Sequence, residues 1–276
     1  MPELPEVETI ARLIRPRLEG RTIEGCEVRW TRTLGGLSRP AFAKAVVGAR
    51  LARVWRRGKY LVADLEHAGR SRGALVGHLR MTGRVHVEKD GWDAGPYLKV
   101  RLPLDDGASF YFIDVRKFAR LWYAADSAEL LGELGPEPLS DDFTAARLHA
   151  ALHDRARMVK PLLMDQTFLA GIGNIYADES LFRAGIHPLA RSDRISRERA
   201  GLLRDVIRET LAAAIEREGS SFDAFYRTPE GNAGTFQDEF QVYGRKGRPC
   251  VRCGEPVRRI VVAQRGTHFC ARCQKR

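Results

Sequence analysis

The first six residues, Met1 to Glu6, combine a proline with two acids in a pattern suited to nucleophilic and acid–base chemistry. Residue 2 is small enough for methionine aminopeptidase to remove Met1, which would expose Pro2 as a secondary amine. An α-amine has a pKa of about 8, so an appreciable fraction is neutral at physiological pH. Attack by this amine on a sugar C1′ carbon would give an iminium cation, which eases a later elimination. Glu3 and Glu6 could then exchange protons. The alternative is an ordinary helix N-terminus capped by glutamates.

Four of the five cysteines form two Cys-x2-Cys pairs, Cys250 with Cys253 and Cys270 with Cys273, separated by sixteen residues. Two such pairs can bring four thiolates to the corners of a tetrahedron, as in a closed structural zinc site. Between them, residues 257–263 are typical of a strand and residues 265–267 of a turn, which predicts a zinc-bound β-hairpin with Arg265 at its tip. A redox pair or chance spacing is the alternative.

A glycine-containing stretch, LAGIGNIYADES, includes Asn174 and precedes a short predicted helix. Glycines allow the backbone to approach a phosphate, and a helix N-terminus offers N–H donors and a positive dipole end. The Asn174 side chain could add a further donor. A tight turn between two helices explains the same residues without a ligand.

Positive charge concentrates at the C-terminal end of the chain. The whole chain carries 46 Lys and Arg against 35 Asp and Glu, a formal charge of 46 − 35 = +11. Residues 240–276 hold ten Lys and Arg and one acid, Glu255, a balance of 10 − 1 = +9. Such a patch suits a polyanion, because neutralising phosphates releases condensed counterions. A solvated basic tail is the alternative.

The length of 276 residues suggests more than one hydrophobic core. No apolar run is long enough for a membrane-spanning helix, and the first twenty residues carry charges instead of a secretory signal. These features predict an intracellular, cytoplasmic protein that does not contact a membrane.

The elements that would position these residues follow from the periodicity. A helix is expected from Pro5 to about Gly20, with Pro16 kinking or shortening it. Residues 22–124 alternate with a period of two in short runs and predict an antiparallel β-sandwich or barrel. An acidic connection, residues 125–142, leads to helices over residues 143–152, 161–166, 177–183 and 196–218. A polar glycine-containing loop follows, up to about Gln237.

Several motifs occur together in one order over essentially the whole chain: PELPEVET, RRGKYL, GHLRMTG, IDVRKF, ELGPEPLSDDF, GIGNIYADESLFRAGIHP, QVYGRKGRPC and CVRC…CARC. In these motifs the chain closely resembles the formamidopyrimidine-DNA glycosylases, bacterial enzymes that remove 8-oxoguanine and ring-opened purines. The residues LPE after the first proline resemble this branch more than the related endonuclease VIII.

The resemblance implies roles for the catalytic residues. Pro2 would form a Schiff base with the sugar C1′, Glu3 would act as the acid that opens the deoxyribose, and Glu6 would support that site. Lys59 would assist β-elimination and hold a phosphate. Arg265 would assist δ-elimination and grip the phosphates beside the lesion.

The resemblance also implies DNA contacts. Met81, Arg116 and Phe118 match the triad that fills the gap left by an extruded base, and apolar and planar cationic side chains suit that purpose. The remaining implied contacts are His78 and Asn174 to phosphates, Tyr97 where some relatives carry histidine, and Arg157, which corresponds loosely to a family lysine.

These expectations define one hypothesis. The fold is α+β: an N-terminal helix and antiparallel β-sandwich domain (residues 1–130), a helix–two-turn–helix domain with a lesion-capping loop (131–236) and a zinc finger (237–276). The function is a bifunctional DNA glycosylase and AP lyase for oxidised purines in base excision repair. It would act as a monomer on damaged double-stranded DNA, with one structural zinc ion and no organic cofactor. The alternatives are an endonuclease VIII-like enzyme for oxidised pyrimidines and a non-catalytic zinc-containing DNA-binding protein.

Overall fold

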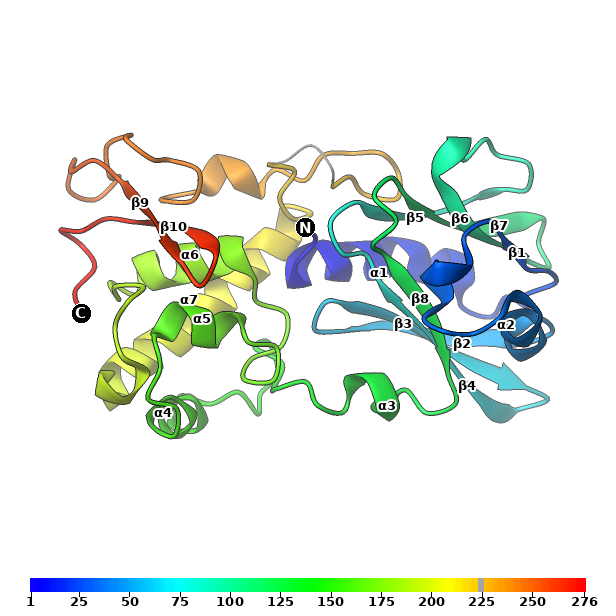
Figure 1. Cartoon of the computed structure of the whole chain (residues 1–276), viewed down its shortest axis with the longest axis horizontal. Coiled ribbons are helices and arrows are strands. Elements are labelled where there is room, and N and C mark those ends of the chain that lie inside the picture. The colour runs from blue at the N-terminus through cyan, green and yellow to red at the C-terminus, as the bar shows by residue number, and fades with distance from the viewer. Residues whose placement is uncertain (223–225) are drawn as a thin grey trace. The chain divides into compact units, whose positions relative to one another are not determined.

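The computed structural model describes residues 1–222 and 226–276 (Figure 1). Their contacts divide them into two compact units. The first comprises Met1–Gly132 and Glu218–Gly234, and the second comprises Glu133–Arg217 and Thr235–Arg276. The segment Glu218–Gly234, which the sequence places in the middle domain, thus has its contacts with the N-terminal unit. The three-part division at residues 130 and 236 stays a prediction.

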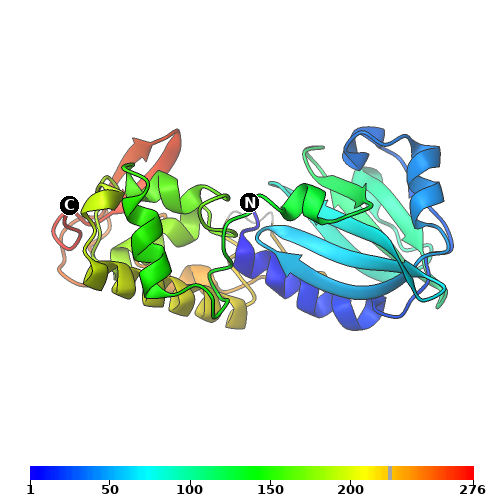
Figure 2. The same ribbon diagram turned by 90° about the horizontal axis from the view of Figure 1, so that it is seen from below.

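The first unit is a sandwich of two four-stranded antiparallel sheets (Figures 1 and 2). One sheet has the order β2-β3-β4-β8 and the other β1-β6-β7-β5. The strand bounds are β1 Glu27–Val28, β2 Arg50–Arg57, β3 Tyr60–His67, β4 Arg70–His78, β5 Gly83–Lys89, β6 Leu98–Pro103, β7 Ala108–Asp114 and β8 Arg120–Ala124. Alternation along these strands sends one set of side chains into the core, as the period of two predicts.

Helix α1, Leu4–Leu18, lies against this sandwich with Val7, Ile10 and Ile14 buried on one face. It contacts β2, β3 and β5. The helix continues through Pro16 and ends at Leu18, slightly before the predicted end near Gly20. Proline removes a single hydrogen bond, and at this position only the last turn depends on it.

Short helices accompany the strands of this unit. These are α2, Arg39–Val46, and 3₁₀ turns at Thr31–Leu34 and Gly95–Tyr97, all within the stretch predicted to be β, and α3, Ala128–Leu131, in the acidic connection. Ser38 caps α2 by accepting a hydrogen bond from the Ala41 N–H, 3.3 Å away.

The second unit is helical and ends in a β-hairpin. Its helices are α4 Ala145–His153, α5 Val159–Met164, α6 Asn174–Arg183 and α7 Arg197–Glu216, with 3₁₀ turns at Ser192–Arg194 and Phe236–Glu239. The hairpin pairs β9, Arg258–Val262, with β10, Arg265–Phe269. Ser196 caps α7. Helices α5 and α6 begin two and three residues earlier than predicted.

Arg265 was expected in the turn at the tip of the hairpin, but it lies just after that turn. Ala263 and Gln264 form the turn, with φ of 44° and 62°, and Arg265 is the first residue of β10, opposite Val262. A two-residue turn with both residues left-handed matches the twist of a hairpin. In the part of the chain that the structure describes, no helix is long and apolar enough to cross a bilayer.

Candidate active site and zinc centre

The N-terminal residues Pro2, Glu3 and Glu6 are buried where α1 begins. Glu3 is the N-cap residue, and its backbone N–H donates to Glu6 Oε2 at 2.8 Å. The other oxygen, Oε1, accepts a hydrogen bond from the Ser220 N–H at 2.8 Å. A single carboxylate therefore joins the start of the chain to a segment more than two hundred residues later.

The contact between Glu6 and this segment depends on Gly219. Its φ is +79°, and a Cβ there would lie 2.8 Å from both Cγ and Oε1 of Glu6. Only glycine allows the backbone so close without strain. Further along the segment, the Tyr226 hydroxyl donates to the Glu218 carbonyl and the Ser221 hydroxyl to the Tyr226 carbonyl, both at 2.9 Å. Residues 223–225 of the predicted capping loop lie outside the described residues.

Lys59 occupies the turn between β2 and β3 and is 6% exposed. Arg56 connects this turn to α1: its Nε donates to Glu8 Oε2 at 2.9 Å, and its Nη1 donates to the Gly58 carbonyl at 3.0 Å. Burial alone would raise the pKa of Glu8, but hydrogen bonds from Arg12 and Arg56 outweigh it and lower the pKa. The carboxylate is thus charged, and α1 and the lysine turn are held together.

His78 lies next to this turn, as the cross-strand neighbour of Tyr60. The two rings meet edge to face with centroids 4.8 Å apart. Burial, together with the positive charges of Arg80 and Lys59, lowers the pKa of His78 to about 3. Its Nδ1 accepts a hydrogen bond from the Arg80 N–H at 3.0 Å, so the proton of the neutral ring is on Nε2, which is a donor suited to an anion.

Three exposed side chains form a cluster on two loops of the same unit. Met81 is 41% exposed and Phe118 49% exposed. Arg116 lies between them, with Nη1 3.0 Å from the Met81 sulfur and its guanidinium carbon 5.0 Å from the centroid of the Phe118 ring. We call these three residues the wedge. Exposed apolar side chains beside a planar cation offer a surface suited to contact with the faces of aromatic rings.

Tyr97 and Arg157, two further predicted DNA contacts, are both exposed. Tyr97 is 46% exposed in the 3₁₀ turn before β6. Arg157 precedes α5, and its Nη1 lies 3.3 Å from Asp165 Oδ2. Exposure is compatible with DNA binding but does not test it, so their roles stay predictions.

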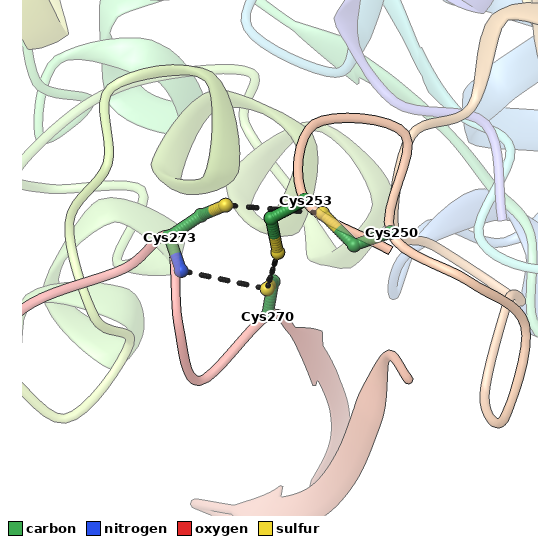
Figure 3. Close-up of side chains that lie close together, drawn as sticks. All are labelled: Cys250, Cys253, Cys270 and Cys273. Carbon is green, nitrogen blue, oxygen red and sulfur yellow. Dashed lines mark hydrogen bonds between the residues drawn. The ribbon is translucent and has the colours of Figure 1, made fainter. Parts of the chain in front are cut away.

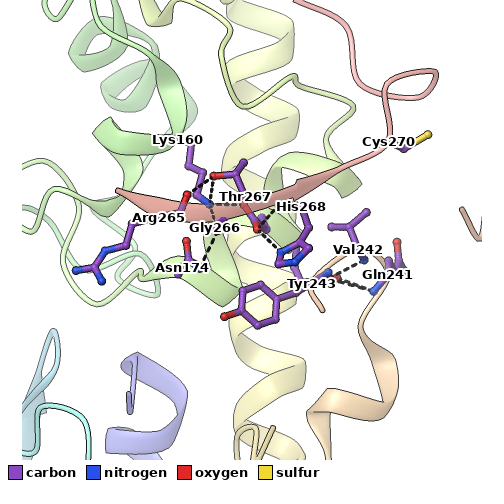
Figure 4. Close-up of polar contacts among 12 residues, drawn as sticks. Lys160, Asn174, Gln241, Val242, Tyr243, Arg265, Gly266, Thr267, His268 and Cys270 are labelled. Carbon is purple, nitrogen blue, oxygen red and sulfur yellow. Dashed lines mark hydrogen bonds and ion pairs between the residues drawn. The ribbon is translucent and has the colours of Figure 1, made fainter. Parts of the chain in front are cut away.

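Asn174 begins α6, and its side-chain amide donates to the Gly266 carbonyl of β10 at 3.0 Å (Figure 4). The same hairpin backbone is held by Lys160, a residue that the sequence analysis did not identify. Its Nζ lies 2.7 Å from Asp178 Oδ1, 2.7 Å from Thr267 Oγ1 and 3.1 Å from the Gly266 carbonyl. Arg265 extends away from this cluster in Figure 4.

Two neighbouring acids of α6 complete this anchoring. Asp178 accepts from the His268 N–H at 2.8 Å. Glu179 accepts hydrogen bonds from the backbone N–H groups of residues 241–243 at 2.9 to 3.1 Å. The sequence analysis did not predict these roles for Lys160, Asp178 and Glu179. The one feature of the sequence that could have indicated them is that these charged residues interrupt otherwise apolar stretches.

The four cysteine sulfurs converge at the base of the hairpin (Figure 3). The sulfurs of Cys250 and Cys273 lie 3.9 Å apart and those of Cys253 and Cys270 lie 3.5 Å apart. Zinc–sulfur bonds of about 2.3 Å in a tetrahedron give sulfur separations of about 3.8 Å, so this cluster fits one zinc ion. Backbone N–H groups of Arg252 and Cys273 point at cysteine sulfurs at 3.4 Å, as expected around thiolates. One structural zinc ion is thereby supported, and four thiolate ligands leave no open position for catalysis.

Comparisons with known proteins give one consistent result. Residues 1–121 match the formamidopyrimidine-DNA glycosylase N-terminal domain, residues 134–225 the helix–two-turn–helix domain of the same enzymes, and residues 247–276 the zinc finger found in these enzymes and in isoleucyl-tRNA synthetases. The formamidopyrimidine-DNA glycosylase of Chloroflexus aggregans is 46% identical over 99% of this chain and 98% of its own length. The Bacillus subtilis enzyme is 38% identical over 99% of both chains.

Solved structures agree with this result. The Fpg protein of Thermus thermophilus superposes with a TM-score of 0.87 and 43% identity, covering 99% of this chain and 98% of that chain. A complex of Lactococcus lactis Fpg with DNA containing an abasic site superposes with a TM-score of 0.89 and 33% identity, covering 99% and 100%. The α+β fold with a helix–two-turn–helix region and a four-cysteine finger is confirmed. On sequence, domain content and fold, the chain belongs to the formamidopyrimidine-DNA glycosylase family.

Proposed function

We propose that this chain is a bifunctional DNA glycosylase and AP lyase that removes oxidised purines, 8-oxoguanine and formamidopyrimidines, during base excision repair. It would act as a monomer on damaged double-stranded DNA in the bacterial cytoplasm. Full-length similarity to enzymes of this name supports the proposal. The observation that carries it is the N-terminal arrangement, in which Pro2 adjoins two buried acids, Glu3 and Glu6.

The reaction would begin at the processed N-terminus. With Met1 removed, the Pro2 nitrogen attacks C1′ of the damaged nucleotide, and Glu3 donates a proton that opens the deoxyribose. Departure of the base with a proton leaves an iminium cation between Pro2 and the sugar. Glu6 holds the Glu3 backbone and the Ser220 backbone at fixed positions through its two oxygens.

Elimination follows from the iminium. Loss of a proton from C2′ expels the 3′ phosphate, and loss of a second proton, from C4′, expels the 5′ phosphate, which leaves a one-nucleotide gap. Lys59 would assist the first elimination and Arg265 the second. The His78 Nε2–H would donate to a backbone phosphate, since a neutral imidazole is a donor that does not titrate near pH 7.

The wedge would fill the space that an everted nucleotide leaves. Extrusion costs a few kcal/mol in lost stacking, and side chains that enter the stack recover part of that cost. Met81 and Phe118 offer apolar surface, while the Arg116 guanidinium can stack and also donate to the unpaired base. Tyr97, Arg157 and Asn174 are proposed as further DNA contacts.

The decisive experiment is borohydride reduction during turnover. We expect a covalent adduct between protein and lesion-containing DNA, with mass spectrometry showing that Met1 is absent and that the sugar is attached to Pro2. Pro2→Gly should reduce strand cleavage sharply, whereas Pro40→Gly, at the exposed start of α2, should not. Full cleavage by Pro2→Gly would contradict the role of Pro2, and absence of any adduct or nicking would favour a non-catalytic DNA-binding protein.

A second substrate class also calls for a test, because Lactococcus lactis Fpg, 33% identical to this chain, has been crystallised with DNA that contains an oxidised pyrimidine. Duplexes carrying 8-oxoguanine or thymine glycol opposite each of the four bases separate the two possibilities. We expect faster release of 8-oxoguanine. Faster release of thymine glycol would indicate an endonuclease VIII-like preference.

A further inference from the structure

The wedge stands on two loops that are both bent by a left-handed residue. Arg80, directly before Met81, has φ of 53°, and Lys117, directly before Phe118, has φ of 62°. Residues other than glycine adopt this conformation only where the surrounding structure enforces it. Both loops must therefore be held by contacts outside the wedge itself.

The contacts converge on one carboxylate at the end of β7. Asp114 is 1% exposed, and its Oδ1 accepts a hydrogen bond from the Arg116 N–H at 3.1 Å while Oδ2 accepts one from the Ala119 N–H at 2.8 Å. These two bonds close the loop from 115 to 119 around the carboxylate. The loop geometry that places Arg116 beside Phe118 thus depends on both oxygens of Asp114.

The same carboxylate reaches the other loop. The Thr82 hydroxyl, on the residue after Met81, donates to Asp114 Oδ1, and the Arg116 N–H also lies 3.3 Å from the Thr82 oxygen. Thr82 is 3% exposed. A short buried hydrogen-bond network therefore fixes the Met81 loop relative to the Arg116–Phe118 loop.

Further contacts hold the outer side of the Arg116–Phe118 loop. Arg120 Nη1 lies 3.1 to 3.3 Å from the carbonyls of residues 117–119. The Lys117 ammonium lies over the Trp30 ring, 4.2 Å from its centroid. Both contacts act on this one loop, whereas Asp114 and Thr82 join the two loops beneath the wedge.

We infer that Asp114, acting with Thr82, is a positioning residue that assembles Met81, Arg116 and Phe118 into one preformed wedge. The inference rests on the proposed function and deepens it. A wedge that is already ordered enters the base stack without first losing loop and side-chain freedom, so the penalty for binding is smaller. Asp114 is buried, so in this proposal it acts through the two loops.

The test is a ratio of two activities in the full-length, zinc-containing protein. The first is single-turnover release of 8-oxoguanine from a duplex opposite cytosine, where eversion leaves a gap to fill. The second is cleavage at an abasic site in a single-stranded oligonucleotide, where no such gap exists. In Asp114→Asn one oxygen becomes an NH₂ donor facing a backbone N–H, so one loop contact is lost. We expect the duplex to single-strand ratio to fall at least fivefold.

The exposed Asp105→Asn, in the turn between β6 and β7, makes the same chemical change away from the wedge and serves as the control. A fall of less than fivefold in Asp114→Asn would overturn the inference. If the wild-type protein cleaves neither substrate and gives no borohydride adduct, the proposed function fails instead, which keeps the two failures distinguishable.

A second pair of variants covers the case in which Asp114→Asn does not fold. Thr82→Val removes the hydroxyl and keeps the shape of the side chain, whereas Thr82→Ser keeps the hydroxyl. We expect the same ratio to be at least threefold lower in Thr82→Val than in Thr82→Ser. Equal ratios in these two variants would overturn the inference.

Discussion

The side chain of His78 is a neutral imidazole, although cationic side chains lie around it. Burial beside Arg80 and Lys59 lowers its pKa to about 3, and its Nδ1 accepts from a backbone N–H. We therefore expect ¹⁵N-histidine spectra to show a single Nε2-protonated ring for His78 from pH 5 to pH 8. A resonance of His78 that titrates in this range would contradict the assignment of its tautomer and charge.

The same shift makes His78 a source of pH dependence in stability. In the unfolded chain histidine takes up a proton below about pH 6.5, whereas the folded protein does so only near pH 3. As the pH falls from 6.5 towards 3, His78 therefore lowers the free energy of unfolding by up to about 1.4 kcal/mol per pH unit. Urea unfolding at pH 7 and pH 5 should show a smaller decrease for His78→Asn than for the wild-type protein.

At the level of elements, α1 and the segment Glu218–Gly234 depend on a close approach at Gly219. Alanine there would combine a strained φ of +79° with a Cβ 2.8 Å from Glu6, whose carboxylate is held by two hydrogen bonds. We expect Gly219→Ala to lower the free energy of unfolding by about 1–3 kcal/mol and to slow base release.

Gly231→Ala is the matched control for this change. Gly231 has φ of +90°, but a Cβ there meets nothing within 4 Å. Gly231→Ala therefore introduces the backbone strain without the steric contact, and we expect it to lower the free energy of unfolding by about 1–2 kcal/mol. Equal loss of stability and activity in both variants would show that the contact with Glu6 contributes nothing.

The β9–β10 hairpin is the element whose stability should depend on the zinc ion. Its small core consists of Phe182, Val242 and Val257 with Cys250 and Cys270, so cysteine packing and zinc are inseparable there. We expect Cys250→Ser to reduce bound zinc from one ion per chain to nearly none, to broaden the amide resonances of β10, and to weaken DNA binding. Zinc content should be measured by atomic absorption and affinity by fluorescence anisotropy.

Cys26→Ser provides the control for the zinc prediction. Cys26 lies outside the four-sulfur cluster, and burial raises the pKa of its thiol to about 11, so it is a poor thiolate donor. One zinc ion per chain should remain in this variant. Full zinc occupancy in Cys250→Ser would contradict the site.

For the whole molecule, the formal charge of +11 governs association with DNA. The logarithm of the affinity should fall linearly with the logarithm of salt concentration, with a slope of about −0.9 for each phosphate neutralised. About six phosphate contacts would weaken binding about 10³-fold between 50 and 200 mM salt. Anisotropy titrations of a lesion-analogue duplex measure this slope, and a slope near zero would contradict binding through the phosphate backbone.

The sequence alone determined the parts of this protein that depend on neighbours along the chain. The terminal proline with its two acids, the paired cysteines and the asparagine at the start of α6 are recognisable because their chemistry depends on spacings of a few residues. The two-residue and helical periodicities likewise identified the β-rich and helical parts, since one face of each element must be buried. Short helices such as α2 were not predicted, because a segment of a few residues is too short to show a clear helical periodicity.

The tertiary structure alone decided which distant residues act together. Glu6 meets Ser220, Lys160 meets Thr267, and Asp114 meets Thr82, each across a gap in sequence that no local pattern spans. A buried polar group must find a partner wherever the fold brings one close. The identity of that partner is fixed by the packing of strands and helices. For this reason the four-cysteine zinc site was predictable from the sequence, whereas the buried residues that hold distant segments together were not.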